Sequence, residues 1–224
     1  TFAASGTTAG TITPTGTSIG TKQGFSLIKY TGTGSAATLP HGLTQAPEFV
    51  VVKNLASTYN WAVYHKDLTS AAYYLFLNNQ DGQSNNYYTF WGSTDPSSTV
   101  INLGVNNTDT NLNTNQSGIS HICYAWHSVP GLQKFGSYTG DATNNPFIEL
   151  GFRPALLWIK NISTGSTDWV VIDSQRQPFN QSNLTKLYIS SANSESTIGV
   201  NSQMNLDFLS NGFKLRDSNN KVNA

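Results

Sequence analysis

The sequence has little charge and a single cysteine. Charged residues make up 11% of its 224 residues, with 12 Lys and Arg against 12 Asp and Glu, so the formal net charge is zero. A chain without a basic surplus or a basic run lacks the charge needed to bind nucleic acid or an anionic membrane. Because Cys123 is the only cysteine, no intrachain disulfide can form and the fold must be held by packing.

Longer patterns are missing as well. No apolar run approaches the roughly 18 residues of a membrane-spanning helix, which argues against membrane insertion. No window keeps a helical apolar period over ten residues, which argues against long amphipathic helices. The sequence begins at Thr1 without the basic and apolar regions of a signal peptide, and we expect a processed product or a fragment of a longer chain.

Uncharged polar residues supply most of the polarity. The chain contains 25 Ser, 26 Thr and 24 Asn, residues that favour turns and strands over helix interiors. Residues 1–23 hold few large apolar side chains, so we expect an extended arm or linker there. From residue 24 onward, short runs rich in Val, Ile, Tyr and Trp alternate with clusters of Gly, Asn, Ser or Pro. This pattern predicts an all-β fold.

Two stretches of the chain repeat each other. Residues 48–65 and 155–173 each contain an apolar run, a Lys-Asn pair, a polar gap and a Trp followed by apolar residues. The offset is 107 at Lys53 and Lys160 and 108 at Trp61 and Trp169. We predict an internal duplication of about 108 residues that builds two tandem antiparallel β-sandwich, jelly-roll-like units, at residues 24–130 and 131–224. One pseudo-symmetric core shared by both repeats is the alternative.

The two repeats end differently. The first finishes with a strongly β run at residues 119–127, and the second has no counterpart before Ala224. We therefore expect the second unit to lack its closing strand. An uncovered apolar edge invites association, so we expect the edge at residues 206–216 to be occupied. The candidate occupants are an adjacent subunit, the 1–23 arm of a neighbour, or chain beyond Ala224.

The sequence shows no pattern typical of catalysis or of metal binding. Glycan hydrolysis needs two facing carboxyl groups, and Glu48, Glu149 and Glu195 are scattered over predicted strand edges and loops. His121, Cys123 and His127 share one face of a predicted strand. We interpret that face as part of a half-buried strand rather than a metal site, because the spacing fits no zinc signature. The expectation is a protein without enzymatic activity, cofactor or metal.

Aromatic residues are the remaining candidates for binding. NNYYTFWG (residues 85–92) has no echo in the second repeat, and aromatic faces beside amides suit sugar rings. Packing between subunits or in a local core is the alternative for this segment. Four residues form the candidate contact with a glycan or an interface: Tyr73, Tyr87, Tyr88 and Trp91. Five other aromatic residues are expected in the core: Phe49, Trp61, Trp126, Trp158 and Trp169.

A series of motifs carries a resemblance. They include GFSLIKYTGTG (24–34), VVVKN (50–54), CYAWHSVPG (123–131), KFGSYTG (134–140), GFRPALLWIKN (151–161) and LSNGFKLR (209–216). Their order over residues 24–224 resembles a duplicated β domain of tailed-phage, especially marine-phage, tail-fibre and virion structural proteins. Members of that family continue into a closing strand, which this sequence lacks, and no catalytic residues come with the resemblance.

The resemblance implies a virion structural protein at the surface of an extracellular particle, as a segment of a tail fibre, spike or other appendage. Its implied partners are other virion subunits, with a homotrimer favoured, and a bacterial surface glycan as ligand. A polysaccharide-degrading enzyme is the alternative from another class. A capsid or tail scaffold domain without a ligand is a third hypothesis.

Overall fold

The computed structural model describes residues 9–85, 90–105, 114–176, 180, 185–197 and 204–223. Within these ranges the chain forms fifteen strands and no helix, so no described segment is a helix that could cross a membrane. All the strand pairs are antiparallel. The prediction of an all-β protein is confirmed.

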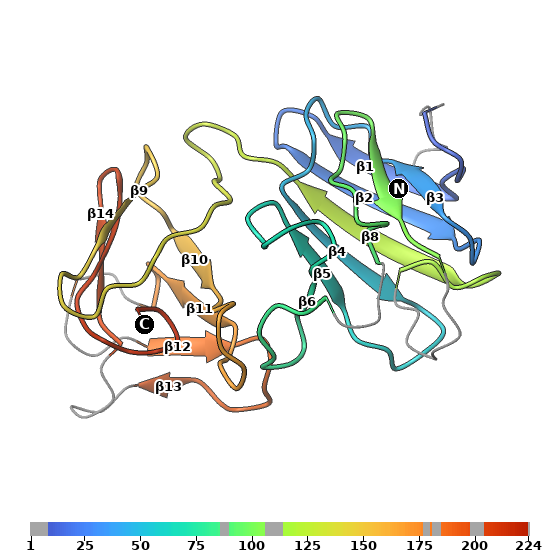
Figure 1. Cartoon of the computed structure of the whole chain (residues 1–224). Coiled ribbons are helices and arrows are strands. Elements are labelled where there is room, and N and C mark those ends of the chain that lie inside the picture. Colours follow the sequence, from blue (N-terminus) through green and yellow to red (C-terminus); the bar gives the residue numbers. More distant parts are fainter. Residues whose placement is uncertain are drawn as a thin grey trace. The chain divides into compact units, whose positions relative to one another are not determined.

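The chain divides into two compact units (Figure 1). Unit 1 consists of Thr1–Leu77 and Gln83–Val129, and unit 2 of Asn78–Gly82 and Pro130–Ala224. The main division thus lies between Val129 and Pro130, next to the boundary expected from the repeat. The inclusion of Asn78–Gly82 in unit 2 was not indicated by any sequence pattern.

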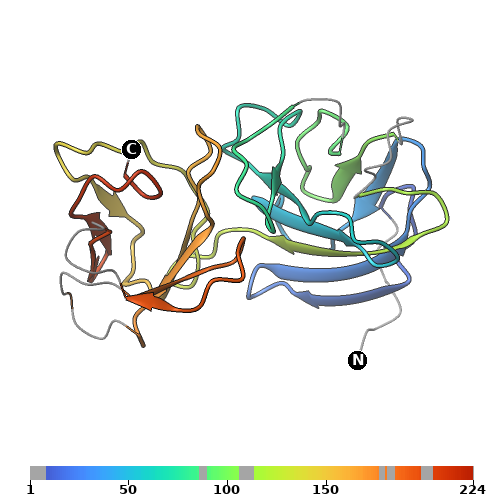
Figure 2. The ribbon, with the colours of Figure 1, turned by 90° about the horizontal axis from the view of Figure 1, so that it is seen from below.

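Unit 1 contains two sheets that lie as separate layers (Figure 2). The larger sheet has the order β1 (Gly16–Gly20), β2 (Phe25–Thr31), β8 (Ser120–Trp126), β4 (Phe49–Asn54), β5 (Ala62–His65) and β6 (Leu75–Phe76). The smaller sheet pairs β3 (Ala37–Pro40) with β7 (Val100–Leu103). The last strand of the unit, β8, therefore occupies a central position between β2 and β4.

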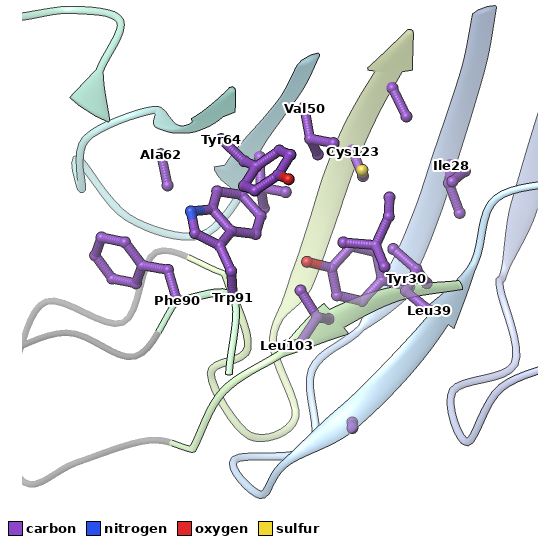
Figure 3. Packing of buried hydrophobic residues seen from close by; sticks show 14 of the residues in the cluster. Ile28, Tyr30, Leu39, Val50, Ala62, Tyr64, Phe90, Trp91, Leu103 and Cys123 are labelled. Atoms are coloured by element: carbon purple, nitrogen blue, oxygen red, sulfur yellow. The ribbon is translucent and has the colours of Figure 1, made fainter. Parts of the chain in front are cut away.

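The core of unit 1 lies between these sheets, and it follows from strand alternation. Ile28 and Cys123 project inward from β2 and β8, and they meet Leu39 and Leu103 from the smaller sheet in one buried cluster (Figure 3). Successive residues of a strand point to opposite faces, so every second residue of these strands joins the core. The 18 buried residues of this cluster supply the burial that holds unit 1 together.

The structure corrects the interpretation of residues 1–23 as an arm or linker. β1 pairs with β2 along its whole length, Thr17 is buried, and Ile12 belongs to the core cluster. The amides of Thr11 and Ile12 both donate to the Thr38 carbonyl, at 3.0 Å each. An edge strand needs few large apolar side chains because its backbone hydrogen bonds hold it, and the low apolar content therefore misled the prediction.

Unit 2 also contains two sheets around one core. The first has the order β10 (Leu156–Ile159), β11 (Val170–Asp173), β12 (Thr185–Tyr188) and β13 (Ser196–Thr197). The second has the order β14 (Leu206–Leu209), β15 (Gly212–Leu215) and β9 (Phe147–Glu149). Ile159 and Ile172 from the first sheet lie in one buried cluster with Phe208 and Leu215 from the second.

Residues 206–216 do not form the uncovered edge that the sequence predicted. β14 and β15 make a hairpin, and β15 pairs on its other side with β9, where Phe213 lies opposite Ile148. The apolar side chains of this hairpin, Leu206 among them, are buried within unit 2. On the β15 side the prediction of an outside neighbour is therefore wrong, because β9 supplies that neighbour from within the unit. On β14, the other edge of this sheet, the Asn180 side chain accepts the Phe208 N–H at 2.9 Å and donates to the Phe208 carbonyl at 3.2 Å.

A tyrosine that is buried in unit 1 and partly buried in unit 2 makes the same contact in both units. The hydroxyl of Tyr30 donates to the carbonyl of Thr114, and the hydroxyl of Tyr138 donates to the carbonyl of Val222 at 2.6 Å. Donor and acceptor are each displaced by 108 residues between the units. A buried phenol hydroxyl needs such a partner, so the contact is part of the fold itself.

A buried asparagine repeats in the same way. Asn115 accepts the backbone N–H of Thr33 at 2.8 Å through its side-chain oxygen, and Asn223 accepts that of Asp141 at 2.6 Å. Their side-chain amides donate to backbone carbonyls, including that of Gly104 at 3.0 Å from Asn115. Since these residues too are 108 apart, the matched contacts support the predicted internal duplication.

Candidate functional site

The four aromatic residues expected to contact a ligand do not form one described surface. Tyr87 and Tyr88 lie outside the described residues. Tyr73 is half-buried in a turn, where its backbone N–H donates to the Ser70 carbonyl at 2.9 Å. Trp91 is only 1% exposed, so it offers no face to a ligand, and the structure corrects its assignment.

Trp91 belongs to the core of unit 1. Its indole meets the ring of Tyr64 edge-on at 5.8 Å between ring centres, as Figure 3 shows, and the neighbouring Phe90 meets Tyr74 at 4.7 Å. The indole nitrogen has no hydrogen-bond partner within the described residues. The flanking Asn, Ser and Thr made this segment resemble an exposed loop, but Phe90 and Trp91 belong to the core of unit 1.

The outer side of the large sheet carries a different set of aromatic residues. On β8, Cys123 and Ala125 face the core, so Tyr124 and Trp126 face outward. The register places Trp126 opposite Phe25 of β2 and also opposite Phe49 of β4. The corresponding ring centres are 4.9 Å and 5.5 Å apart, so three aromatic side chains form a row across three adjacent strands.

A second row crosses the first at Trp126. The rings of Tyr124 and Trp126 are 6.1 Å apart and inclined by 12°, and those of Trp61 and Tyr124 are 6.4 Å apart and inclined by 30°. Phe49 is buried, whereas the other four residues are half-buried. We call the set formed by Phe25, Phe49, Trp61, Tyr124 and Trp126 the aromatic face.

Polar groups lie at the Phe49 end of the aromatic face. The Glu48 carboxylate accepts hydrogen bonds from Lys66 Nζ at 2.7 Å and from the backbone N–H of Ser128 at 2.5 Å. Burial acts to raise the pKa of Glu48, but these hydrogen bonds outweigh it and hold the pKa below its ordinary value. The carboxylate is therefore ionised at neutral pH, and it fixes Lys66 in place.

His65 joins the aromatic face to these polar groups. Its ring lies 6.2 Å from that of Phe49, and its Nδ1 accepts the backbone N–H of Asp67 at 3.1 Å. Burial lowers the pKa of His65, with Lys66 acting in the same direction and Asp67 and Glu48 opposing it. The imidazole is neutral at pH 7 and carries its proton on Nε2, a hydrogen-bond donor.

The face shared by His121, Cys123 and His127 points into the core. All three residues are buried, and His121 stacks on Tyr30 with ring centres 5.2 Å apart. Burial raises the pKa of the Cys123 thiol, which makes it a poor nucleophile and a poor metal ligand. In the described part of the chain, no group of three or more His, Cys, Asp or Glu side chains could hold a metal ion.

The other aromatic residues expected in the core divide into three groups. Trp169 is buried as expected, and Phe49 is buried on the outer side of its sheet. Trp61 and Trp126 are half-buried members of the aromatic face. Trp158 is 46% exposed on β10, so its assignment to the core is wrong. The alternation of CYAW on β8 signals an outward aromatic pair, and it could have identified Tyr124 and Trp126 from the sequence.

Comparison with known proteins gives one match. The model of a family described as a domain of unknown function (DUF7483) matches residues 1–224. No curated protein and no solved structure matches the chain.

Proposed function

The chain belongs to the DUF7483 family, and we propose that it is a non-enzymatic structural protein of a virion that binds a bacterial surface glycan. Its place is a segment of a tailed-phage tail fibre, spike or other appendage on the outside of the particle. The resemblance of its motif series to phage tail proteins supports the virion part of the proposal. The aromatic face of unit 1 carries the glycan part.

Aromatic rings on a rigid sheet suit carbohydrate. Sugar rings present C–H faces that stack on aromatic side chains, and hydroxyls that need hydrogen-bond partners at the edge. Trp126 is held between Phe25 and Phe49, and Tyr124 lies beside it, so these side chains have little rotamer freedom to lose on binding. Lys66 and His65 offer donors at the end of the rows.

Carboxylate placement supports a binding role rather than hydrolysis. Glu48 is engaged by Lys66 and Ser128. Of the other glutamates, Glu149 lies on β9 and Glu195 lies 3.6 Å from Arg176, both in unit 2. Unit 1 therefore has no second glutamate, and Glu48 is already bound by Lys66 and Ser128, which leaves it poorly placed to be one of the two Asp or Glu carboxyl groups that hydrolysis requires.

Glycan binding is tested with the full chain on an array of bacterial capsule and lipopolysaccharide fragments. We expect saturable binding to at least one polysaccharide and a loss of roughly tenfold or more for Trp126→Ala, which removes a stacking platform. Tyr124→Phe keeps the ring and should keep most of the affinity. Trp158→Ala is the matched control, because it removes an exposed Trp away from the aromatic face.

An array that stays blank, or equal binding by Trp126→Ala and the unchanged chain, would reject the glycan part of the proposal. The appearance of new reducing ends after incubation with host polysaccharide would reject the non-enzymatic part. Immunogold labelling of intact particles with antibodies to the chain tests the virion part, and absence of label from the tail and its appendages would count against it.

A further inference from the structure

The segment Asn78–Gly82 is hydrogen-bonded to a hairpin of unit 2. Within unit 2, the Gln80 carbonyl accepts the backbone N–H of Thr167 at 3.2 Å and Lys160 Nζ at 3.0 Å. The Gln80 side-chain amide donates to Asp168 at 2.6 Å. One residue therefore makes three hydrogen bonds to the hairpin that joins β10 to β11.

Lys160 is the central donor of the hairpin that joins β10 to β11. Besides Gln80, its Nζ donates to the carbonyl of Thr167 at 2.5 Å and to the hydroxyl of Thr167 at 3.2 Å. The segment also approaches the hairpin closely, because a Cβ on Gly82 would lie 2.9 Å from the Ile162 carbonyl oxygen. The main chain of the segment, more than its side chains, is thus what the hairpin recognises.

Unit 1 contains the counterpart of this hairpin at residues 53–61. Lys53 corresponds to Lys160, Tyr59 to Thr167 and Asn60 to Asp168 by the spacing of the repeat. Lys53 Nζ donates to the Tyr59 carbonyl at 2.5 Å, which matches the bond from Lys160 to Thr167. The same lysine-centred arrangement is therefore built in both units.

The two hairpins differ in the acceptors that are bonded to their donor groups. In unit 2, the Thr167 N–H and one N–H of Lys160 are taken up by the Gln80 carbonyl. In unit 1, no backbone carbonyl of the described residues accepts the Tyr59 N–H. Lys53 Nζ donates to the carbonyls of Ser57 and Tyr59, which leaves one of its three N–H groups available. Unit 1 thus has two donors in the place where unit 2 binds a carbonyl.

Unit 2 in turn carries a counterpart of the docked segment. The N–H of Leu77 donates to the Trp61 carbonyl at 3.0 Å, and that of Ile189 donates to the Trp169 carbonyl at 3.1 Å. Residues 190–194 therefore follow β12 as Asn78–Gly82 follow β6. Ala192 takes the position of Gln80, and it is exposed together with the next three residues.

We propose that residues 190–194 of one copy dock on the 53–61 hairpin of a second copy of this chain. The Ala192 carbonyl accepts hydrogen bonds from Tyr59 N–H and Lys53 Nζ of the second copy, as Gln80 does within unit 2. Ala192 has no side-chain amide, so the contact depends on the main chain.

The geometry of this contact limits the assemblies that it can build. Two different surfaces meet, so the contact is heterologous, and repeating it gives either a closed ring or an open chain. A closed ring of two copies makes the contact twice and has two-fold symmetry, and a closed ring of three copies is the trimer favoured for a fibre. The inference does not depend on glycan binding, because its two donor residues, Lys53 and Tyr59, are not part of the aromatic face.

Sedimentation velocity over a concentration series tests the proposal with the full chain. We expect the chain to associate as concentration rises, into a dimer, a trimer or a ladder of larger species. Lys53→Met keeps the alkyl stem and removes the donors, and it should weaken association by roughly tenfold. Lys29→Met is the matched control, since Lys29 is an exposed lysine on β2 outside the hairpin, and it should leave association unchanged.

A gain of association gives a second test. The double variant Asn60→Asp with Ala192→Gln rebuilds between copies the charge-assisted bond that Gln80 makes with Asp168. It should tighten association by roughly tenfold, and neither single variant should do so. A monomer at every concentration for both the unchanged chain and the double variant overturns the proposal. Equal weakening of association by Lys53→Met and Lys29→Met overturns it as well.

Discussion

Unit 1 and unit 2 share their buried contacts and differ on the outer sides of their larger sheets. Phe49 and Val51 on β4 are 5% and 2% exposed, whereas the corresponding Leu156 and Trp158 on β10 are 53% and 46% exposed. The buried tyrosine and asparagine contacts are nevertheless the same in both units. The comparison teaches that the two units match in these interior contacts, and that they differ in the burial of the outer sides of their larger sheets.

The neighbours of the matched strands account for part of this difference. β4 lies between β5 and β8, and β8 brings Tyr124 and Trp126 to the outer side. Among the described residues, β10 is the first strand of its sheet and β11 is the next. In unit 1, β8 supplies the outward aromatic side chains beside β4. In the part of the chain that the structure describes, no strand occupies the equivalent position beside β10.

The largest expected effect comes from Trp91, which fills the space between the sheets of unit 1. Trp91→Ala should lower the free energy of unfolding of unit 1 by about 3–5 kcal/mol, the range for removal of a large buried aromatic side chain. Hydrogen exchange read by mass spectrometry should show faster exchange in unit 1 and little change in unit 2. Equally faster hydrogen exchange in both units would mean that the two units unfold together, which would contradict their treatment as separate units.

The next effect tests whether the repeated asparagines are equivalent. Asn115→Ala and Asn223→Ala should each destabilise their own unit by about 1–3 kcal/mol, because each leaves a backbone N–H and backbone carbonyls without their partner. Urea denaturation followed by hydrogen exchange assigns each loss to a unit. A large effect of one variant and none of the other would contradict the matched roles of the two residues.

A third test uses acid, because all four histidines lie in unit 1. Burial lowers the pKa of His41 and of His65, so these side chains resist protonation in the folded state. The unfolded chain protonates them near pH 6.5. The stability they contribute is present above that pH and is lost as pH falls through their lower folded-state pKa values.

Unit 1 should therefore lose stability before unit 2 when the pH is lowered from 7.5 to 5.5. Hydrogen exchange at the two pH values, corrected for intrinsic exchange rates, measures this difference directly. The double variant His41→Gln with His65→Gln should remove most of it. Earlier loss of protection in unit 2 would be the opposite of the expected order.

The smallest effect is expected at Trp158. Trp158→Ala should change the free energy of unfolding by no more than about 0.5 kcal/mol, since the side chain is largely exposed. Val51→Ala, at the corresponding position of unit 1, should cost more because Val51 is buried. Thermal unfolding of the two variants side by side sharpens the comparison, and a greater loss at Trp158 would refute it.

Local sequence patterns predict the strands well and the connections poorly. Runs such as FVVVKN and SHICYAW alternate or continue as strands do, and they form β4 and β8. Trp91 was misassigned because its neighbours are polar, although its own burial is set by the two sheets around it. Trp158 was misassigned because it lies in the apolar run LLWI, although every second residue of that strand is exposed. The docking of Asn78–Gly82 depends on contacts about 80 residues apart, with no local signature.

The thiol of Cys123 can be used as a natural probe for the opening of unit 1. The side chain is completely buried in the core, and it is the only thiol in the chain. A thiol reagent can therefore label the protein only when the sheets of unit 1 separate. The labelling rate in native buffer gives the opening equilibrium of unit 1 alone, with no engineered probe, while unit 2 contributes no background signal.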